Sequence, residues 1–358
     1  MNLIAHDLVL VHPMTSITGY ISYVQYVAGT TKGDVNNGDV FNDPFKLGKV
    51  DPNYTSDKVV ETVPTGKTEI TLAWTPVVEG AFTDEKGDKH DVKIISGDTV
   101  KYADVADGKV TGLAEGDRVA YEYNNVIIPQ ANVPTLRAEM KNMTLFAHAR
   151  RIAVYYSQIA AFQAKTDYGF DLGDQLAEKA VGQLSYEIDT EIVKLLDETA
   201  GDAKADLTWS KTLPTGVSKA EHYEGFYEIV EIARQLIYDK TKRFAPNYMI
   251  IASNILPILG FIKGWNAAPA GQINGPYFAG NLGSLKVFVS PELEAGRFDI
   301  GVNGDDFMSS VAVYAPYMPI VPTQLLQFND GGSTQGWSTM YDLKVLNSDL
   351  IVAGKVTA

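Results

Sequence analysis

The side chains that most often carry catalysis or bind metals are present, but their spacing matches no catalytic or metal-binding arrangement. No two histidines have the i, i+4 spacing of a helical metal pair, and there is no HExxH motif. The histidines are His6, His12, His90, His148 and His222. Cysteine is absent, which excludes disulfides, thiol catalysis and zinc sites built on thiolates.

Motifs for nucleotides, serine hydrolysis and calcium are missing as well. The chain has no GxGxxG, Walker A or GxSxG motif, and GGSTQG at residues 331–336 lacks the lysine and the helix of a phosphate loop. The oxygen-rich stretches NNGDVFND and NGDD do not fit EF-hand spacing. We therefore expect no catalytic, cofactor-binding or metal-binding residues, and we predict that the protein is not an enzyme.

Carboxylates are densest between residues 187 and 198, where they could form a metal or acid–base cluster. They point around more than one side of a predicted helix and are accompanied by Lys194, so we favour a solvated face or a face at a subunit seam. These carboxylates are Glu187, Asp189, Glu191, Asp197 and Glu198. In the extended segment predicted before this helix, Arg150 and Arg151 belong to two alternating sets of residues, one for each face of a strand. The nearby His148 is interpreted as a structural residue.

The element that must position these groups is a long helix predicted over residues 170–200. Asp171 can cap its start, and Gly201 follows its end, where positive φ is common. At roughly 1.5 Å per residue the helix would be about 40 Å long. Its apolar residues recur at steps of three and four and form one stripe, namely Ala177, Val181, Leu184, Ile188, Ile192 and Leu195.

The composition is that of an ordinary globular protein with room for two or three domains. The chain has 358 residues, of which 45% are hydrophobic and 21% are charged. No apolar run is long enough for a transmembrane helix, and the start lacks the pattern of a signal peptide. The net charge of -14 argues against tight or sequence-specific binding to nucleic-acid phosphates.

The first half of the chain reads as β-structure. Strands are predicted within residues 1–30, a long Gly- and Asn-rich loop over 29–56, and extended chain over 133–156. Short strands separated by turns form a β-island at about 65–125, which we interpret as an insertion into a loop. A carbohydrate-binding or adhesive module is the alternative for this island.

The second half alternates between helices and strands. A short helix is predicted over 157–169, and a longer one starts at the capping box of Ser218 and Glu221 and continues to Pro246. A buried strand over NYMIIAS and a short helix over 254–262 indicate an α/β subdomain. The tail over 323–347 is predicted as two long strands joined by a Gly-rich turn at 330–336.

This order of elements resembles the HK97-type major capsid proteins of tailed bacteriophages, in the branch of the T-even and other contractile-tailed phages. The resemblance rests on NLIAHDLVLVHPMTSITGYISYV, on RRIAVYYSQIAAFQAKTDYGFDLGDQLAEKAVGQLSYEIDTEIVKLL, and on NYMIIASNILPIL, GSLKVFVSP, VAVYAPYMPIVP and STMYDLKVLN. It covers most of the chain except residues 65–125.

The resemblance implies an α+β fold with a spine helix, peripheral and axial domains, an extended loop and a β-rich insertion. Residues 1–45 would be N-terminal strands joining the peripheral domain, and 46–156 the extended loop with the inserted β-domain at about 65–125. The peripheral domain with the spine helix would span 157–217 and the axial domain 218–322. Residues 323–358 would be return strands of the peripheral domain.

The resemblance also implies the function: a structural subunit that self-assembles into hexamers and pentamers of an icosahedral head enclosing double-stranded DNA. Portal, scaffold, maturation protease and decoration proteins are the further partners that it suggests; no cofactor, no membrane and no nucleic-acid sequence are expected. Assembly would take place in the host cytoplasm, and the product would be the virion capsid. The expected subunit-interface residues are Arg150, Arg151, Glu187, Glu191, Tyr314 and Tyr317.

Two expectations qualify this interpretation. Relatives carry an N-terminal arm before the region where this chain begins with Met1, so we expect a truncated or processed start and a monomer or aberrant assemblies. An encapsulin-like protein compartment, or a surface-binding module that uses the β-insertion, is the alternative function.

Overall fold

The computed structural model describes residues 4–42, 51, 53–124, 133–269, 275–329 and 331–357. The chain divides into two compact units. The main unit comprises residues 1–21 and 142–358, and the inserted unit comprises residues 22–141. Both helices and sheets contribute to the main unit, as the α+β prediction requires.

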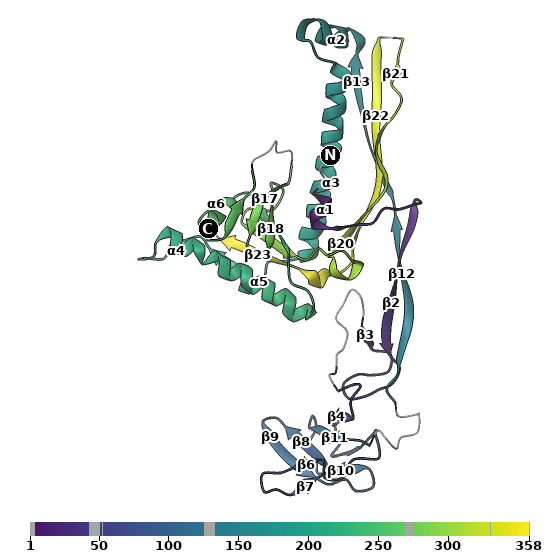
Figure 1. The fold of residues 1–358 in the computed structure, drawn as a ribbon, viewed down its shortest axis with the longest axis vertical. Helices are drawn as coiled ribbons and strands as arrows, with labels where there is room; N and C mark the ends of the chain where they lie inside the picture. The colour runs from purple at the N-terminus through teal and green to yellow at the C-terminus, as the bar shows by residue number, and fades with distance from the viewer. Residues whose placement is uncertain are drawn as a thin grey trace. The chain divides into compact units, whose positions relative to one another are not determined.

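The long helix predicted from the apolar stripe is present as α3, Leu172–Ala200 (Figure 1). The Asp171 carboxylate accepts hydrogen bonds from the backbone N–H groups of Gly173 and Asp174, and Gly201 ends the helix with φ 70°. Leu184, Ile188 and Ile192 are buried, whereas the other three stripe residues are half-buried. A short helix α2 (Gln158–Gln163) and a π-helix (Ala164–Tyr168) precede it, as predicted.

Removal of the helix cap gives a first test of α3. We expect Asp171→Ala to lower the free energy of unfolding by about 1 kcal/mol, because two backbone N–H groups at the positive end of the helix lose their acceptor. Thermal unfolding followed by circular dichroism measures the change. Asp167→Ala, an exposed carboxylate before the helix, is the control; equal effects of the two substitutions would contradict the assignment of Asp171 as the cap.

One face of α3 packs on a five-stranded sheet in the order β1–β20–β22–β13, with β21 also paired to β22. The strands are β1 (Leu10–Val11), β13 (His148–Ser157), β20 (Ala312–Pro322), β21 (Leu326–Gln327) and β22 (Gly332–Val345). Ala180 and Leu184 of the helix pack with Trp337 of the sheet. Figure 1 shows α3 lying along β13 and β22.

The second sheet of the main unit has seven strands and holds most of the core. Its order is β14–β23–β19–β15–β18–β17–β16. The strands are β14 (Thr208–Ser210), β15 (Tyr248–Ala252), β16 (Trp265–Ala267), β17 (Tyr277–Leu282), β18 (Leu285–Ser290), β19 (Arg297–Gly301) and β23 (Ile351–Thr357). Three helices, α4 (Lys219–Glu224), α5 (Phe226–Thr241) and α6 (Leu256–Leu259), contribute to the same hydrophobic core. The apolar side chains along one face of α5 are buried in it.

The inserted unit consists of small sheets. A four-stranded sheet has the order β4–β11–β8–β9, formed by β4 (Lys58–Thr62), β8 (Val92–Ser96), β9 (Thr99–Ala103) and β11 (Arg118–Glu122). Hairpin-like pairs join β5 (Glu69–Thr71) to β10 (Lys109–Thr111) and β6 (Phe82–Thr83) to β7 (Lys89–His90). Strands β2 (Thr18–Ala28), β3 (Val40–Asn42) and β12 (Leu136–Phe146) form a ribbon that belongs in part to each unit.

Several sequence predictions are wrong in detail. The first strand, predicted over LIAHDLVLVHP, is a strand only at β1 (Leu10–Val11). Its first half is a one-turn helix, α1 (Ala5–Leu8), because the turn lets both Leu8 and Val9 enter the core, whereas consecutive residues of a strand face opposite sides. The helix predicted from Ser218 is divided at Gly225 into α4 and α5, and the helix predicted over 254–262 spans only α6.

The tail and the β-island also differ from their predictions. Residues 332–336 lie inside β22, so the turn ends at Gly331 and the strand before it, β21, has only two residues. The island begins earlier than residue 65, because β4 pairs with β11 and Val59 is in its core. In the loop predicted over 29–56, β3 forms at Val40–Asn42, and residues 43–50 and 52 lie outside the described residues.

The five-part domain division stays a prediction. The strand pairing bears on one boundary, since β23 joins the seven-stranded sheet beside β19, and residues 323–358 therefore contribute to both sheets.

Candidate functional site

Three of the predicted interface residues meet on the polar side of α3. The guanidinium of Arg150 on β13 pairs with the Glu191 carboxylate at 2.6 Å and with the Glu187 carboxylate at 3.4 Å. The Tyr341 hydroxyl on β22 donates a hydrogen bond to Glu191, and the Arg150 guanidinium lies 5.7 Å from the centre of the Tyr341 ring. These contacts tie the helix to two strands of the sheet on which it packs.

Burial decides the electrostatics of this cluster. The Arg150 side chain is only 33% exposed, so its ion pairs are less screened than those of a free surface arginine. Burial, followed by the hydrogen bond to Glu191, raises the pKa of the Tyr341 hydroxyl, which therefore stays a donor at neutral pH. The ion pairs and hydrogen bonds of the cluster join the helix to the sheet, so the arrangement supports a structural role.

A double-mutant cycle on Arg150 and Glu191 tests this role. The pair is partly buried, and the Arg150 guanidinium contacts two carboxylates of the helix. We therefore expect a coupling free energy of about 1–2 kcal/mol, above the usual value for exposed pairs. The variants are Arg150→Met, Glu191→Gln and their combination, measured by denaturant unfolding. A coupling energy of zero would mean that the contacts do not hold the helix to the sheet.

The other predicted interface residues lie in different surroundings. Arg151 is exposed on the strand beside Arg150, and Tyr317 is half-buried at an irregular part of β20. Tyr314 is 6% exposed and packs against Tyr341, and burial raises the pKa of its hydroxyl to about 12. The interface role of the six residues stays a prediction; Arg151 has the most exposed surface for it, and Tyr314 has little.

Two helix carboxylates were misinterpreted as members of a solvated or interface face. Asp189 is 6% exposed and accepts a hydrogen bond from the backbone N–H of Ile4. Asp197 pairs with Arg297 of β19 at the end of the helix. Each therefore joins the helix to another segment of the main unit.

A groove of about 550 Å³ runs beside the cluster on α3. Its lining combines four glutamates with only two basic side chains, so it is acidic overall. Glu292 faces the helix across the groove, where it accepts a hydrogen bond from the Tyr186 hydroxyl at 2.7 Å. The lining residues are Arg150, Tyr186, Glu187, Thr190, Glu191, Lys194, Leu195, Glu198 and Glu292.

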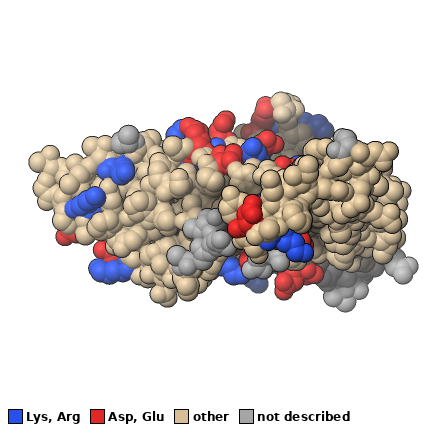
Figure 2. Space-filling model, turned by 90° about the horizontal axis from the view of Figure 1, so that it is seen from above, with Lys and Arg blue, Asp and Glu red and all other residues tan. Residues whose placement is uncertain are grey.

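Charge is dispersed on the one face of the molecule that the space-filling view shows (Figure 2). On the face that Figure 2 shows, acidic and basic side chains occur in small groups between uncharged areas, without a broad basic patch. Within the described ranges no three His, Asp or Glu side chains are grouped as metal ligands. None of the helices in the described part of the chain combines the length and apolarity that a membrane crossing requires.

In the inserted unit, the side chain of Lys32 is 1% exposed and fills a cage of acceptors. Its ammonium donates to the backbone carbonyls of Asn53 at 3.0 Å and Tyr54 at 3.1 Å, and also to that of Ser56. The Tyr123 hydroxyl lies 3.3 Å away, and the Trp74 ring centre 5.4 Å away. Nothing in the stretch TTKGD indicates this burial, so sequence reasoning missed it.

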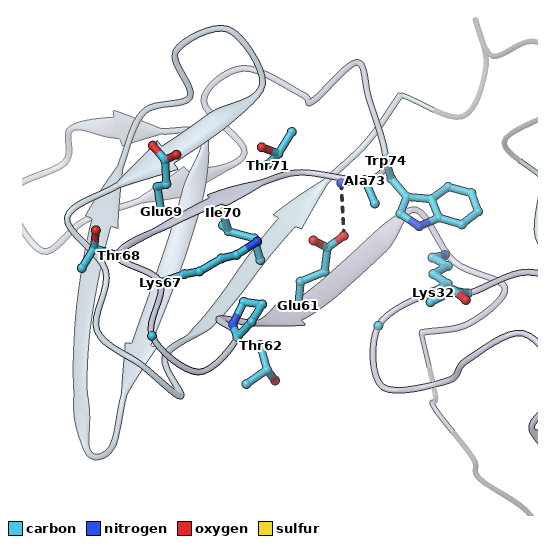
Figure 3. Close-up of a pocket in the computed structure, with 14 residues that line it drawn as sticks. Lys32, Glu61, Thr62, Lys67, Thr68, Glu69, Ile70, Thr71, Ala73 and Trp74 are labelled. Atoms are coloured by element: carbon cyan, nitrogen blue, oxygen red, sulfur yellow. Dashed lines mark hydrogen bonds between the residues drawn. The ribbon is translucent and has the colours of Figure 1, made fainter.

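A hollow of about 670 Å³ opens next to this cage. Figure 3 shows the Lys67 side chain extending in the direction of the Glu61 carboxylate. Glu61 accepts hydrogen bonds from the Tyr121 hydroxyl at 2.5 Å and from the backbone N–H of Ala73, and burial raises its pKa. Threonine hydroxyls at 62, 68 and 71 complete a lining suited to a ligand with several hydroxyl groups.

Comparison with known proteins gives matches along almost the whole chain. The family model for major capsid protein Gp23 matches residues 1–354. The major capsid protein of Vibrio phage KVP40 is 22% identical, over 96% of this chain and 73% of that protein. The major capsid protein of Enterobacteria phage T4 is 23% identical, over 68% of this chain and 50% of that protein.

Solved structures with a similar arrangement include that of Mycobacterium phage Bobi. The match has a TM-score of 0.47 at 10% sequence identity and covers 100% of this chain and 90% of the other.

Proposed function

The chain belongs to the major capsid protein Gp23 family, and from this premise we propose how it builds the shell of a phage head. Copies assemble into hexamers and pentamers of an icosahedral shell that encloses double-stranded DNA. The observation that carries the proposal is the family match over residues 1–354. The subunit acts as a structural element without catalytic activity, is assembled in the host cytoplasm and works with portal, scaffold, maturation protease and decoration proteins.

The described surface supports assembly, because many large apolar side chains lie exposed. On the ribbon, Tyr20 is 63% and Met140 is 74% exposed. Near α2, Phe162 and Tyr168 are more than 70% exposed, and Leu326 on β21 is 56% exposed. Exposed apolar area of this kind marks surfaces that are covered in an assembly. We propose that the ribbon is part of an extended loop that reaches over a neighbouring subunit.

The acidic groove on α3 is the second surface that we place at a subunit seam. Its four glutamates are matched by only Arg150 and Lys194, so a basic side chain of a neighbouring copy would complement it. Arg151 lies on the face of β13 opposite to Arg150, so in this proposal it and Tyr317 supply subunit contacts outside the groove.

Charge reversal at Arg151 tests the proposed interface role of this residue. We expect Arg151→Glu to reduce the yield of shells severalfold while leaving the Tm of the unassembled subunit within about 1 °C, because the side chain is exposed in the subunit. Sedimentation measures the assembled fraction, and calorimetry measures the Tm. Normal shell yield would remove Arg151 from the interface.

Negative-stain microscopy of the purified chain tests the function itself. Polyhedral shells, hexamers or pentamers would support the structural function, and shells of normal size would also reject the expectation of a monomer or aberrant assemblies. Shells made in infected cells should protect double-stranded DNA from nuclease. Shells that hold a protein cargo and no DNA would favour an encapsulin-like compartment. A strictly monomeric protein that turns over a small substrate would contradict a structural role.

The hollow beside Glu61 favours a second function for the inserted unit, the binding of surface saccharides. Carboxylate, ammonium and hydroxyl groups on its walls offer the mixed donors and acceptors that a polyhydroxylated ligand requires. Binding of the full chain to a glycan array is the test, with Lys67→Ala as the variant that should lose it. An array without retained signal, or a signal unchanged in Lys67→Ala, would reject this function.

A further inference from the structure

The C-terminal end of α3 is joined to strand β19 by one guanidinium shared between two carboxylates. The Arg297 Nη2 donates to the backbone carbonyls of Asp197 at 3.0 Å and Gly201 at 2.7 Å, and the Asp197 carbonyl also accepts a hydrogen bond from the backbone N–H of Gly201. The Nε of the same side chain pairs with the Asp197 carboxylate and lies 3.5 Å from the Asp299 carboxylate. Arg297 therefore holds the last turn of the helix.

Asp299 is the unusual member of this cluster. It lies in the middle of β19, between Ile250 of β15 and Ala353 of β23, and its side chain is 0% exposed. Neither of its ionised carboxylate oxygens accepts a hydrogen bond from a donor among the described residues, and the Asp197 carboxylate lies close enough to accept one from Asp299 when Asp299 is protonated. With both aspartates ionised, the cluster would carry one net negative charge at a buried position, which raises the free energy of the folded state.

The groups around Asp299 leave it no other counter-charge. From α3 it faces Asp197, which repels its ionised form, and from β15 it faces Tyr248, whose buried hydroxyl has no hydrogen-bond partner in the described part of the chain. On β23, Lys355 is directed to Glu294 at 2.7 Å. Burial raises the pKa of Asp299 to about 8, and Arg297 opposes this rise.

We propose that Asp197, Arg297 and Asp299 form a proton-controlled joint at the end of α3. With Asp299 protonated the cluster is neutral, and Arg297 clamps the helix carbonyls. When the carboxyl gives its proton to water or hydroxide, the new charge draws the guanidinium toward Asp299, and the last turn of α3 loosens. This inference does not rest on the proposed function, because it concerns contacts within one chain.

The direction of the pH effect follows from linkage. An aspartate in an unfolded chain titrates near pH 3.9, whereas Asp299 in the folded chain titrates near 8. Between these values the folded state holds a proton that the unfolded state has lost. Stability from this group is therefore greatest at low pH and falls through the window, by up to about tenfold in the unfolding equilibrium constant per pH unit.

Amide hydrogen exchange of the full chain tests the joint. After correction for intrinsic rates, protection of residues 196–200 should fall by up to about tenfold per pH unit between about pH 6 and about pH 8 in the unmodified protein, and should level off at higher pH. Asp299→Asn should abolish this fall. Glu294→Gln, which removes an exposed carboxylate nearby, should retain it. Equal protection at both pH values, or a fall that persists in Asp299→Asn, overturns the proposal.

A second variant keeps the proposal testable if Asp299→Asn does not fold. Asp197→Asn removes the like charge and frees Arg297 to pair with Asp299, so the loosening should move to lower pH. A midpoint that stays in place or moves to higher pH contradicts the joint.

Discussion

Replacing Ile188 by aspartate is expected to abolish soluble folding of the main unit. Ile188 lies in the middle of α3, is 1% exposed and belongs to the largest hydrophobic cluster. The new carboxylate would therefore be buried among the hydrophobic side chains of this cluster. Such a group costs several kcal/mol, which is comparable to the whole stability of a domain.

Soluble yield and thermal unfolding measure this effect, and two control variants define its cause. Lys179→Asp introduces the same side chain at an exposed position of the same helix and should change stability little. Ile188→Val removes one methylene group and should cost about 1 kcal/mol. If Ile188→Asp folds with an unchanged Tm, the apolar stripe of α3 is not core and the packing of the helix is wrong.

Replacing Lys32 by methionine is expected to destabilise the inserted unit by about 3–5 kcal/mol. Methionine has a similar length but no donor, so the carbonyls of Asn53, Tyr54 and Ser56 would lose the partner that they share at a side chain only 1% exposed. The contacts of the ammonium with the rings of Trp74 and Tyr123 would be lost as well.

Hydrogen exchange of the β4 and β11 amides locates this loss within the inserted unit. Exchange there should accelerate strongly in Lys32→Met, while the amides of the seven-stranded sheet keep their protection. Lys86→Met changes an exposed lysine of the same unit and is the control. Unchanged exchange at β4 and β11 would show that the cage contributes nothing to the stability of the unit.

The features that sequence reasoning predicted correctly are those encoded by neighbouring residues. The stripe of α3, its cap at Asp171 and the break at Gly201 are local signals, and each is found in the structure. The apolar run of β15 is equally local, and all five of its residues are buried. The motifs that carried the resemblance to phage capsid proteins lie along nearly the whole chain, and the family match confirms it.

The features that were missed depend on residues distant in sequence. Residues 5–8 are helical because Leu8 and Val9 must both enter a core supplied by later segments, and β4 joins the island because β11 lies beside it. Within the candidate site, the sequence pattern predicted Arg150, Glu187 and Glu191 as interface residues but did not indicate Tyr341. The Tyr341 hydroxyl donates a hydrogen bond to Glu191, which lies 150 positions earlier in the chain. Asp299 had a usable signal, since a charged residue within the apolar strand FDIGV is uncommon.

The position of β23 has a consequence for how the protein is made. This strand, Ile351–Thr357, lies between β14 and β19 in the seven-stranded sheet. The strands at residues 208–210 and 297–301 therefore become part of one continuous sheet only when β23 has paired with both of them. A ribosome adds residues in order, and a sheet closed by such distant residues forms late and slowly. A growing chain would therefore remain without its completed core until residue 357 has left the ribosome.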